Sequence, residues 1–227
     1  MNKKSIFNAI LLKERIKLHK LFWLPFVIAI AVCADIYMNY KSVVSSHGAA
    51  ALWVQLVYKQ SIYFDKLKWV FVIGGALFAY LQFMPECKNK RLRLMFHLPV
   101  SHRFSIYSML FIGFILNVIL SLSGFICLLL VFLAFGFPYE LTSQMLLSLI
   151  PWSFAGIVSY FALSSIIAES SITKRLALAF MAVVFVSLLT ETNGFFSIKS
   201  DLWLYILSSF FWLFAFEAAA LRIKDGK

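Results

Sequence analysis

Charged residues are scarce in this chain of 227 amino acids. Asp, Glu, Lys and Arg together make up 14% of it, whereas about 25% is usual for soluble domains. Hydrophobic residues make up 62%. A single domain of this size cannot hide that much apolar surface from water. The composition therefore argues against a soluble fold and predicts an all-α integral membrane protein.

Acidic residues and cysteines are especially few. The chain holds 10 Asp and Glu against 21 Lys and Arg, a formal charge of +11. In a membrane protein such an excess is first an orientation signal, so we expect no nucleic-acid partner. Cys33 and Cys127 lie in apolar runs and Cys87 in a basic segment. This odd set of cysteines suggests no disulfide framework.

Motifs for catalysis are also missing from the sequence. It contains no G-x-x-x-x-G-K-[ST] loop, so the chain does not hydrolyse ATP by that route. It contains no H-E-x-x-H and no set of Ser, His and acid that indicates a protease. The spacing of Cys87, His97 and His102 fits no zinc signature. We therefore expect no enzyme activity, no metal and no cofactor in this chain by itself.

Apolar segments of spanning length are abundant instead. A membrane helix needs about 20 apolar residues, and six segments reach or approach that length: 21–40, 69–85, 104–137, 141–168, 175–190 and 202–221. The apolar run that opens the first one resembles a signal peptide, but the helix-patterned residues before it favour a retained span. The third exceeds the hydrocarbon core, so one end should project from it. Pro151 predicts a kink in the fourth.

The basic residues predict the orientation of these segments. With both termini in the cytoplasm, 16 of the 21 Lys and Arg lie inside, and five lie outside: Lys41, Lys59, Lys66, Lys68 and Lys199. This bias predicts six spans. Residues 41–68 and 191–201 are then extracytoplasmic, and the first of them contains a short apolar stretch around Trp53 and Tyr58 that suits a helix on the outer interface.

Residues 1–20 form a basic amphipathic segment before the first span. Apolar residues recur there at helical spacing, and Lys13 and Lys17 fall on the other face. One interpretation is a surface helix that only anchors the first span in lipid. The other is an elbow helix that also docks a cytosolic partner. Glu14, a lone acid among bases, favours the second.

Residues 86–101, between the second and third segments, have a second amphipathic pattern. Leu92, Met95 and Phe96 share one helical face, while Arg91 lies largely elsewhere. Pro99 ends or turns this helix. The segment is either a positively charged anchor or a helix that inserts into a soluble partner.

This segment resembles the permease subunits of ABC-2 type exporters. Those proteins carry a Glu after the second span, followed at thirteen residues by the Pro of a "PVS"-like motif, with leucines between. Here Glu86 is followed at that spacing by Pro99 in "LPVS", which ends at Ser101, and Leu92 and Leu94 lie between. The plan of elbow helix and six spans is similar as well.

The resemblance implies a partner and a site. A separate ABC ATPase would hold ATP and magnesium, and a second copy or a related permease would complete the assembly in the cytoplasmic (inner) membrane of a bacterium. The residues implied to couple to the ATPase are Glu86, Arg91, Leu92, Leu94, Met95, Phe96, Pro99 and Ser101. A secondary transporter or channel, and a scaffold or assembly factor that transports nothing, remain the alternatives.

Three acids lie near or within the apolar segments. We expect Glu169 to pair with Lys174 and Arg175, and Glu217 to pair with Arg222. Asp35 has no basic partner in its own span, which makes it a candidate for lining a path. Glu217 is a second candidate for that role, because acids in lipid are costly unless paired or used.

Overall fold

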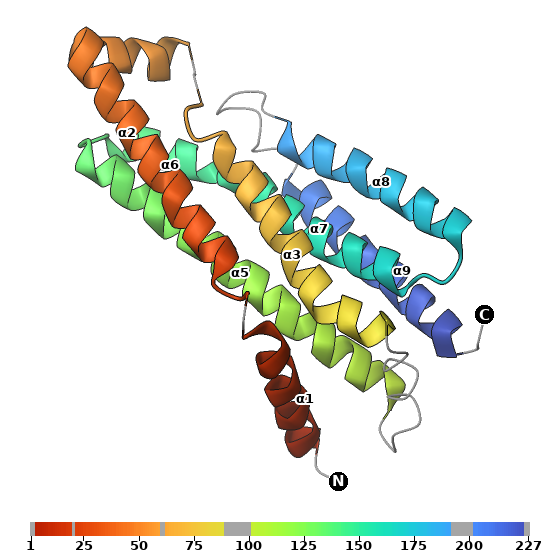
Figure 1. Cartoon of the computed structure of the whole chain (residues 1–227). Helices are drawn as coiled ribbons and strands as arrows, with labels where there is room; N and C mark the ends of the chain where they lie inside the picture. The colour runs from red at the N-terminus through yellow and green to blue at the C-terminus, as the bar shows by residue number, and fades with distance from the viewer. Residues whose placement is uncertain (1–2, 20, 60–61, 89–100, 192–201, 225–227) are drawn as a thin grey trace.

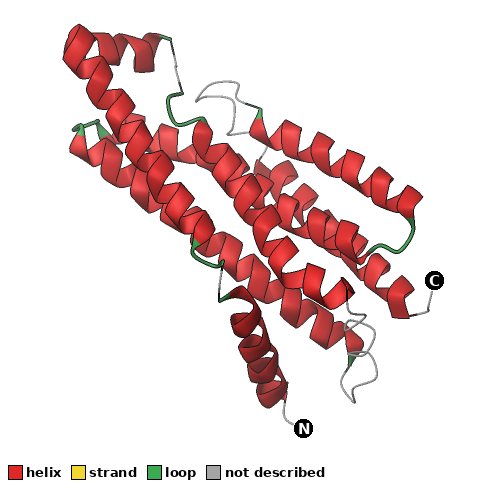
Figure 2. Cartoon of the chain, in the orientation of Figure 1, coloured by secondary structure: helices red, strands yellow, loops and turns green. Residues whose placement is uncertain are grey.

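The computed structural model describes residues 3–19, 21–59, 62–88, 101–191 and 202–224. Within these residues the chain is helical and contains no strand (Figures 1 and 2). The elements are α1 (Lys3–Leu18), α2 (Leu24–Trp53), η1 (Val54–Tyr58), α3 (Lys66–Lys88), α5 (His102–Ala134), α6 (Tyr139–Leu147), α7 (Leu149–Ala168), α8 (Ile172–Thr190) and α9 (Leu202–Lys224).

Five helical stretches of the described residues are long and apolar enough to cross a membrane: Leu24–Ala50, Lys66–Lys88, His102–Ala134, Tyr139–Ala168 and Ile172–Thr190. The prediction of a multi-pass, all-helical membrane protein is confirmed at that level. The sixth predicted span corresponds to α9, which is not among these five. A count of six therefore remains a prediction.

Helix α7 is the centre of the bundle. It packs against α3, α5, α6, α8 and α9, and 14 of its 20 residues are buried. In Figure 1, α2 and α5 lie on one side of α3 and α7, and α8 and α9 lie on the other. The outer faces of α2, α5, α8 and α9 expose large apolar side chains, as a lipid-facing surface requires.

Glycines allow α3 and α7 to approach backbone to backbone. A Cβ at Gly75 would lie 2.1 Å from the carbonyl oxygen of Gly156, and a Cβ at Gly156 would lie 2.8 Å from that of Phe71. Beside them, Ser159 Oγ donates a hydrogen bond of 2.9 Å to Val72 O. Small residues at helix contacts in membranes serve this purpose, so this contact determines how the two central helices meet.

The bounds of α2 differ from the predicted first span. The helix does not end near residue 40 but continues to Gly48, whose φ of 78° lies in the left-handed region. Pro25 lies in the first turn of α2, where it is tolerated, and from residue 26 to 47 the helix contains no glycine or proline that would stop it. After the bend, residues 49–58 are helical, with Leu56 buried and the Trp53 ring packed 6.0 Å from that of Phe137.

The predicted kink in the fourth segment falls at Ser148, three residues before Pro151. That position separates α6 from α7. Pro151 has no N–H to bond to the carbonyl of Leu147, and its ring pushes against that turn. In the same turn, Ser148 Oγ donates to Met145 O at 2.6 Å. The break therefore lies in the turn that the proline disturbs.

The reversal between α5 and α6 is a Schellman turn. Gly136 has a φ of 65°, Gly136 N donates to Leu133 O at 3.1 Å, and Phe137 N donates to Phe132 O at 3.3 Å. The Phe137 ring also packs on Phe132, with 5.8 Å between centroids. Glycine suits this position because it has no Cβ to strain. The chain reversal is thus determined by a few neighbouring residues.

Candidate functional site at the junction of α1 and α3

An ion cluster joins α1 to the last turn of α3. Glu86 is fully buried, and its Oε1 lies 2.9 Å from Lys13 Nζ and 2.6 Å from Lys17 Nζ. Lys17 Nζ also donates to Glu14 Oε1 at 2.7 Å. We call Lys13, Glu14, Lys17 and Glu86 the elbow cluster. In this cluster Lys17 binds both Glu14, the lone acid of α1, and Glu86, the first residue of the predicted coupling segment 86–101.

Burial dominates the electrostatics of the α1 part of this cluster. The Glu14 side chain is fully buried, and burial raises the pKa of its carboxyl above 4.5, although Lys17 and Lys13 act in the opposite direction. Oε2 of Glu14 and Oε2 of Glu86 have no hydrogen-bond partner among the described residues. Lys13 and Lys17 therefore hold two carboxylates, each of which has an oxygen without a hydrogen-bond partner in the described part of the chain. The contact between α1 and α3 is for this reason sensitive to a displacement of either helix.

One turn before Glu86, a hydrogen-bonded chain links three helices. Tyr160 Oη of α7 donates to Gln82 Oε1 of α3 at 2.6 Å. Gln82 Nε2 donates in turn to Met109 O of α5 at 2.8 Å. All three residues are buried. Because Gln82 and Glu86 lie on one face of α3, a shift of the end of α3 acts on α1, α5 and α7 together.

The expected partners of Glu169 need correction. Its side chain is 1% exposed and pairs with Arg222 of α9, and neither Lys174 nor Arg175 binds its carboxylate. Arg175 Nη2 instead donates to the backbone oxygen of Glu169 at 2.6 Å. The expectation of a structural pair holds with a partner 53 residues away, and that partner fastens α9 to the end of α7.

The expected partner of Glu217 is corrected as well. Glu217 Oε1 lies 3.0 Å from Arg103 Nε, and Tyr107 Oη donates to its Oε2 at 2.6 Å. Arg222 follows five residues later on α9, which turns it by about 140° around the helix axis. The two side chains therefore face different neighbours, and Glu217 joins α9 to α5.

Asp35 has a base that sequence reasoning missed. Its Oδ2 lies 2.6 Å from Lys66 Nζ at the start of α3, and Asn39 Nδ2 donates to it at 3.2 Å. Its side chain is 45% exposed. The missed signal was the position of Lys66 at the start of the next helix, which antiparallel packing brings alongside α2. Asp35 is thus a paired, half-exposed acid.

Most of the predicted coupling residues fall outside the described part of the chain: Arg91, Leu92, Leu94, Met95, Phe96 and Pro99. Ser101 is exposed and extended just before α5, and its side chain does not cap that helix. The elbow cluster is therefore the part of the predicted site that the structure brings together.

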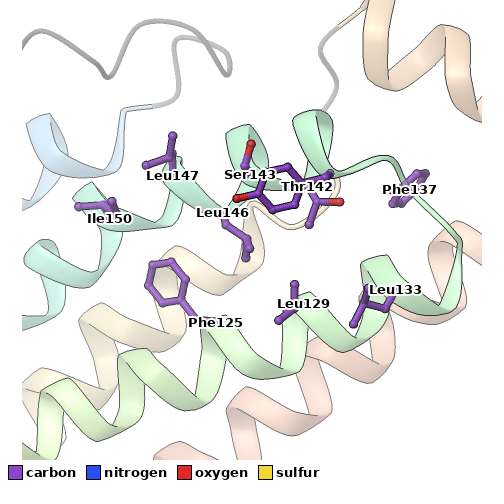
Figure 3. A pocket seen from close by; sticks show the side chains of 10 residues that line it. Phe125, Leu129, Leu133, Phe137, Thr142, Ser143, Leu146, Leu147 and Ile150 are labelled. Atoms are coloured by element: carbon purple, nitrogen blue, oxygen red, sulfur yellow. The ribbon is translucent and has the colours of Figure 1, made fainter.

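Apolar hollows open on the surface of the described part of the bundle. One, of ≈ 460 Å³, lies between α5 and the α6–α7 pair (Figure 3), at the end of the bundle away from α1 (Figure 1). Leu129, Leu146 and Ile150 line it, and Ser143 Oγ, at its edge, donates to Glu140 O. Within the described residues, no group of three or more His, Cys, Asp or Glu could hold a metal ion. The hollows suit hydrocarbon.

No protein-family model, curated protein or solved structure matches the chain. The helices and the buried charge pairs between them define its class: it is a multi-pass α-helical membrane protein.

Proposed function

We propose that the chain is the permease subunit of an ATP-driven ABC exporter, with α9 as a sixth span and both termini in the cytoplasm of a bacterium. The observation that carries the proposal is the elbow cluster. It joins the amphipathic helix α1 to Glu86, the residue from which the family-like spacing to Pro99 is counted. A simple lipid anchor does not require this buried contact with α3.

The sixth span has support in the packing of α9. One side of that helix packs on α7, with Trp212 and Phe216 buried. The other side exposes Trp203, Leu207 and Phe214. A helix with one packed and one exposed apolar face suits the edge of a membrane bundle.

The coupling mechanism follows from the contacts of α3. Closure of the ATPase pair would push residues 86–101, and the buried Gln82 would transmit the motion to Met109 of α5 and Tyr160 of α7. Lys13 and Lys17 would make α1 follow. The motion is then a rigid-body displacement of packed helices, and substrate would pass along the interface with the second permease.

The topology can be tested by labelling. In a variant without the three native cysteines, Ser46→Cys and Ser197→Cys should react with a membrane-impermeant maleimide in intact cells, because both positions are assigned to the outside. Asn89→Cys should react only after the membrane is opened. Labelling of Asn89→Cys in intact cells would contradict the six-span orientation.

The ATPase partner can be tested by co-purification from the native membrane. Burial of a large apolar side chain contributes about 1.5 to 3 kcal/mol, so Phe96→Ala should weaken ATPase binding by more than about tenfold. Leu92→Asp should do the same. Arg91→Ala is the matched control, with a smaller effect that depends on salt. All three variants should reach the membrane at normal levels.

Two results would overturn the assignment. One is recovery of no nucleotide-binding chain with the wild-type permease. The other is coupled transport and association that survive Phe96→Ala. The scaffold interpretation would then replace the exporter.

A further inference from the structure

A hollow of ≈ 710 Å³ lies between α1, with the turn that follows it, and the first half of α5. Leu11 and Phe22 form part of one wall, and Phe111 and Ile115 form part of the other. Several of these side chains are exposed, with Phe111 at 52% and Trp23, also in the lining, at 68%. A surface of this kind is stable only when hydrocarbon covers it.

The same hollow has a polar edge. Arg15 and His19 belong to its lining and are exposed. Neither side chain has a hydrogen bond or ion pair with another residue in the described part of the chain, in contrast to Lys13 and Lys17 on the same helix. The guanidinium of Arg15 is therefore free to bind an anion, and His19 adds a ring N–H.

We infer that this hollow binds one anionic phospholipid. An acyl chain lies along Phe111 and Ile115. The phosphate oxygens accept hydrogen bonds from the guanidinium of Arg15 and a further one from the ring N–H of His19. Arginine suits this role because its planar fork binds two phosphate oxygens at once. This inference does not rest on the proposed exporter function, since it needs only the membrane and the described side chains.

Charge makes a second copy of the chain a poor occupant. A second copy would need an exposed acid to meet Arg15. Near this end of the bundle, the described acids are already engaged or hidden: Glu14, Glu86 and Glu169 are at most 1% exposed, and Glu217 binds Arg103. Symmetric contact through α1 would instead bring basic residues together. A lipid supplies both the hydrocarbon and the anion.

A neighbouring hollow serves as an internal comparison. It measures ≈ 450 Å³, shares Phe7 and Phe111 with the first, and is otherwise lined by side chains such as Phe114 and Phe210. Among the described residues that line it there is no cation, and the guanidinium nearest in sequence, that of Arg103, is paired with Glu217. Hydrocarbon can fill this second hollow, but no described side chain in its lining carries a charge that would select a headgroup.

The experiment is native mass spectrometry of the full-length protein in a neutral detergent. It is titrated with phosphatidylglycerol or with phosphatidylcholine of the same acyl chains. Wild type should bind one phosphatidylglycerol about fivefold more tightly than phosphatidylcholine, as expected for one basic side chain at a lipid headgroup. Arg15→Gln should abolish that preference. Lys174→Gln, an exposed cation on α8 outside the hollow, is the matched control and should preserve it.

A second pair of variants tests the hydrocarbon site. Ile115→Trp fills the hollow and should reduce the binding of both lipids, whereas Ile119→Trp, one turn further along α5 and outside the lining, should not. Equal binding of the two lipids by wild type, or a preference that survives Arg15→Gln, would overturn the inference. A dimer that Ile115→Trp dissociates, with no retained lipid, would assign the hollow to a second copy instead.

Discussion

Replacement of Glu86 by glutamine is expected to loosen α1 from the rest of the bundle. The change preserves the shape of the side chain but removes the charge that both Lys13 and Lys17 approach. Lys17, whose side chain is 13% exposed, is then left with Glu14 as its acidic partner. Loss of one partner in a buried ion pair costs several kcal/mol, and we expect about 2 kcal/mol here because Glu14 remains. Amide exchange in α1 should accelerate roughly thirtyfold.

Glu14→Gln is the matched variant, with the opposite expectation. Because burial raises the pKa of Glu14 above 4.5, the folded state holds that proton more tightly than the unfolded state does. Stability contributed by this group is therefore lost as the pH rises from about 4.5 through the raised pKa. Glutamine cannot ionise, so the variant should lose this pH dependence. At neutral pH, α1 should be at least as protected as in wild type. Acceleration equal to that of Glu86→Gln would contradict this assignment.

Replacement of Gly75 by alanine is expected to have the largest effect on stability. Its new methyl group would lie 2.1 Å from the backbone oxygen of Gly156, and backbone cannot move aside as a side chain can. The two central helices must separate, so we expect a loss of about 3 kcal/mol, at the upper end for overpacked cores. Denaturation of the purified protein in mixed micelles measures it.

Gly74→Ala is the control at the adjacent position. The added methyl group there meets Leu120 Cδ2 at 2.4 Å, the far end of a flexible side chain that can rotate. The expected loss is under about 1.5 kcal/mol, and helix propensity offsets part of it. Equal losses at the two positions would show that the close approach of α3 and α7 is not what the glycines serve.

Properties that depend on local sequence could be predicted well. Hydropathy and charge indicated a multi-pass helical protein, and Pro151 indicated a break within one turn of where it occurs. Glu14, noticed as a lone acid among bases, proved to be a buried member of the elbow cluster. Each of these signals operates over a few residues, within the range of periodicity and propensity.

Contacts between distant helices could not be predicted in the same way. Glu169 binds Arg222 across 53 residues, and Asp35 binds Lys66 across 31. From a single sequence, ion-pair partners are predicted from their proximity along the chain. For this reason Lys174 and Arg175 were expected to pair with Glu169, and Arg222 with Glu217. The actual partner of each acid depends on which faces of α2, α3, α7 and α9 meet, and those faces are determined by the packing of the helices.

The separation of partners along the chain also has a consequence for the order of synthesis. The Schellman turn at Gly136 can form as soon as α5 and the next few residues exist, because its bonds span only five residues. Gln82 waits longer. Met109, which accepts from its amide, is made 27 residues later, and Tyr160, which donates to it, is made 78 residues later. Until then the nascent α3 carries the side-chain amide of Gln82 without its partners, and Glu86 near one end is not yet buried. Both groups must remain hydrated, or be held by the insertion machinery, until α7 has been synthesised.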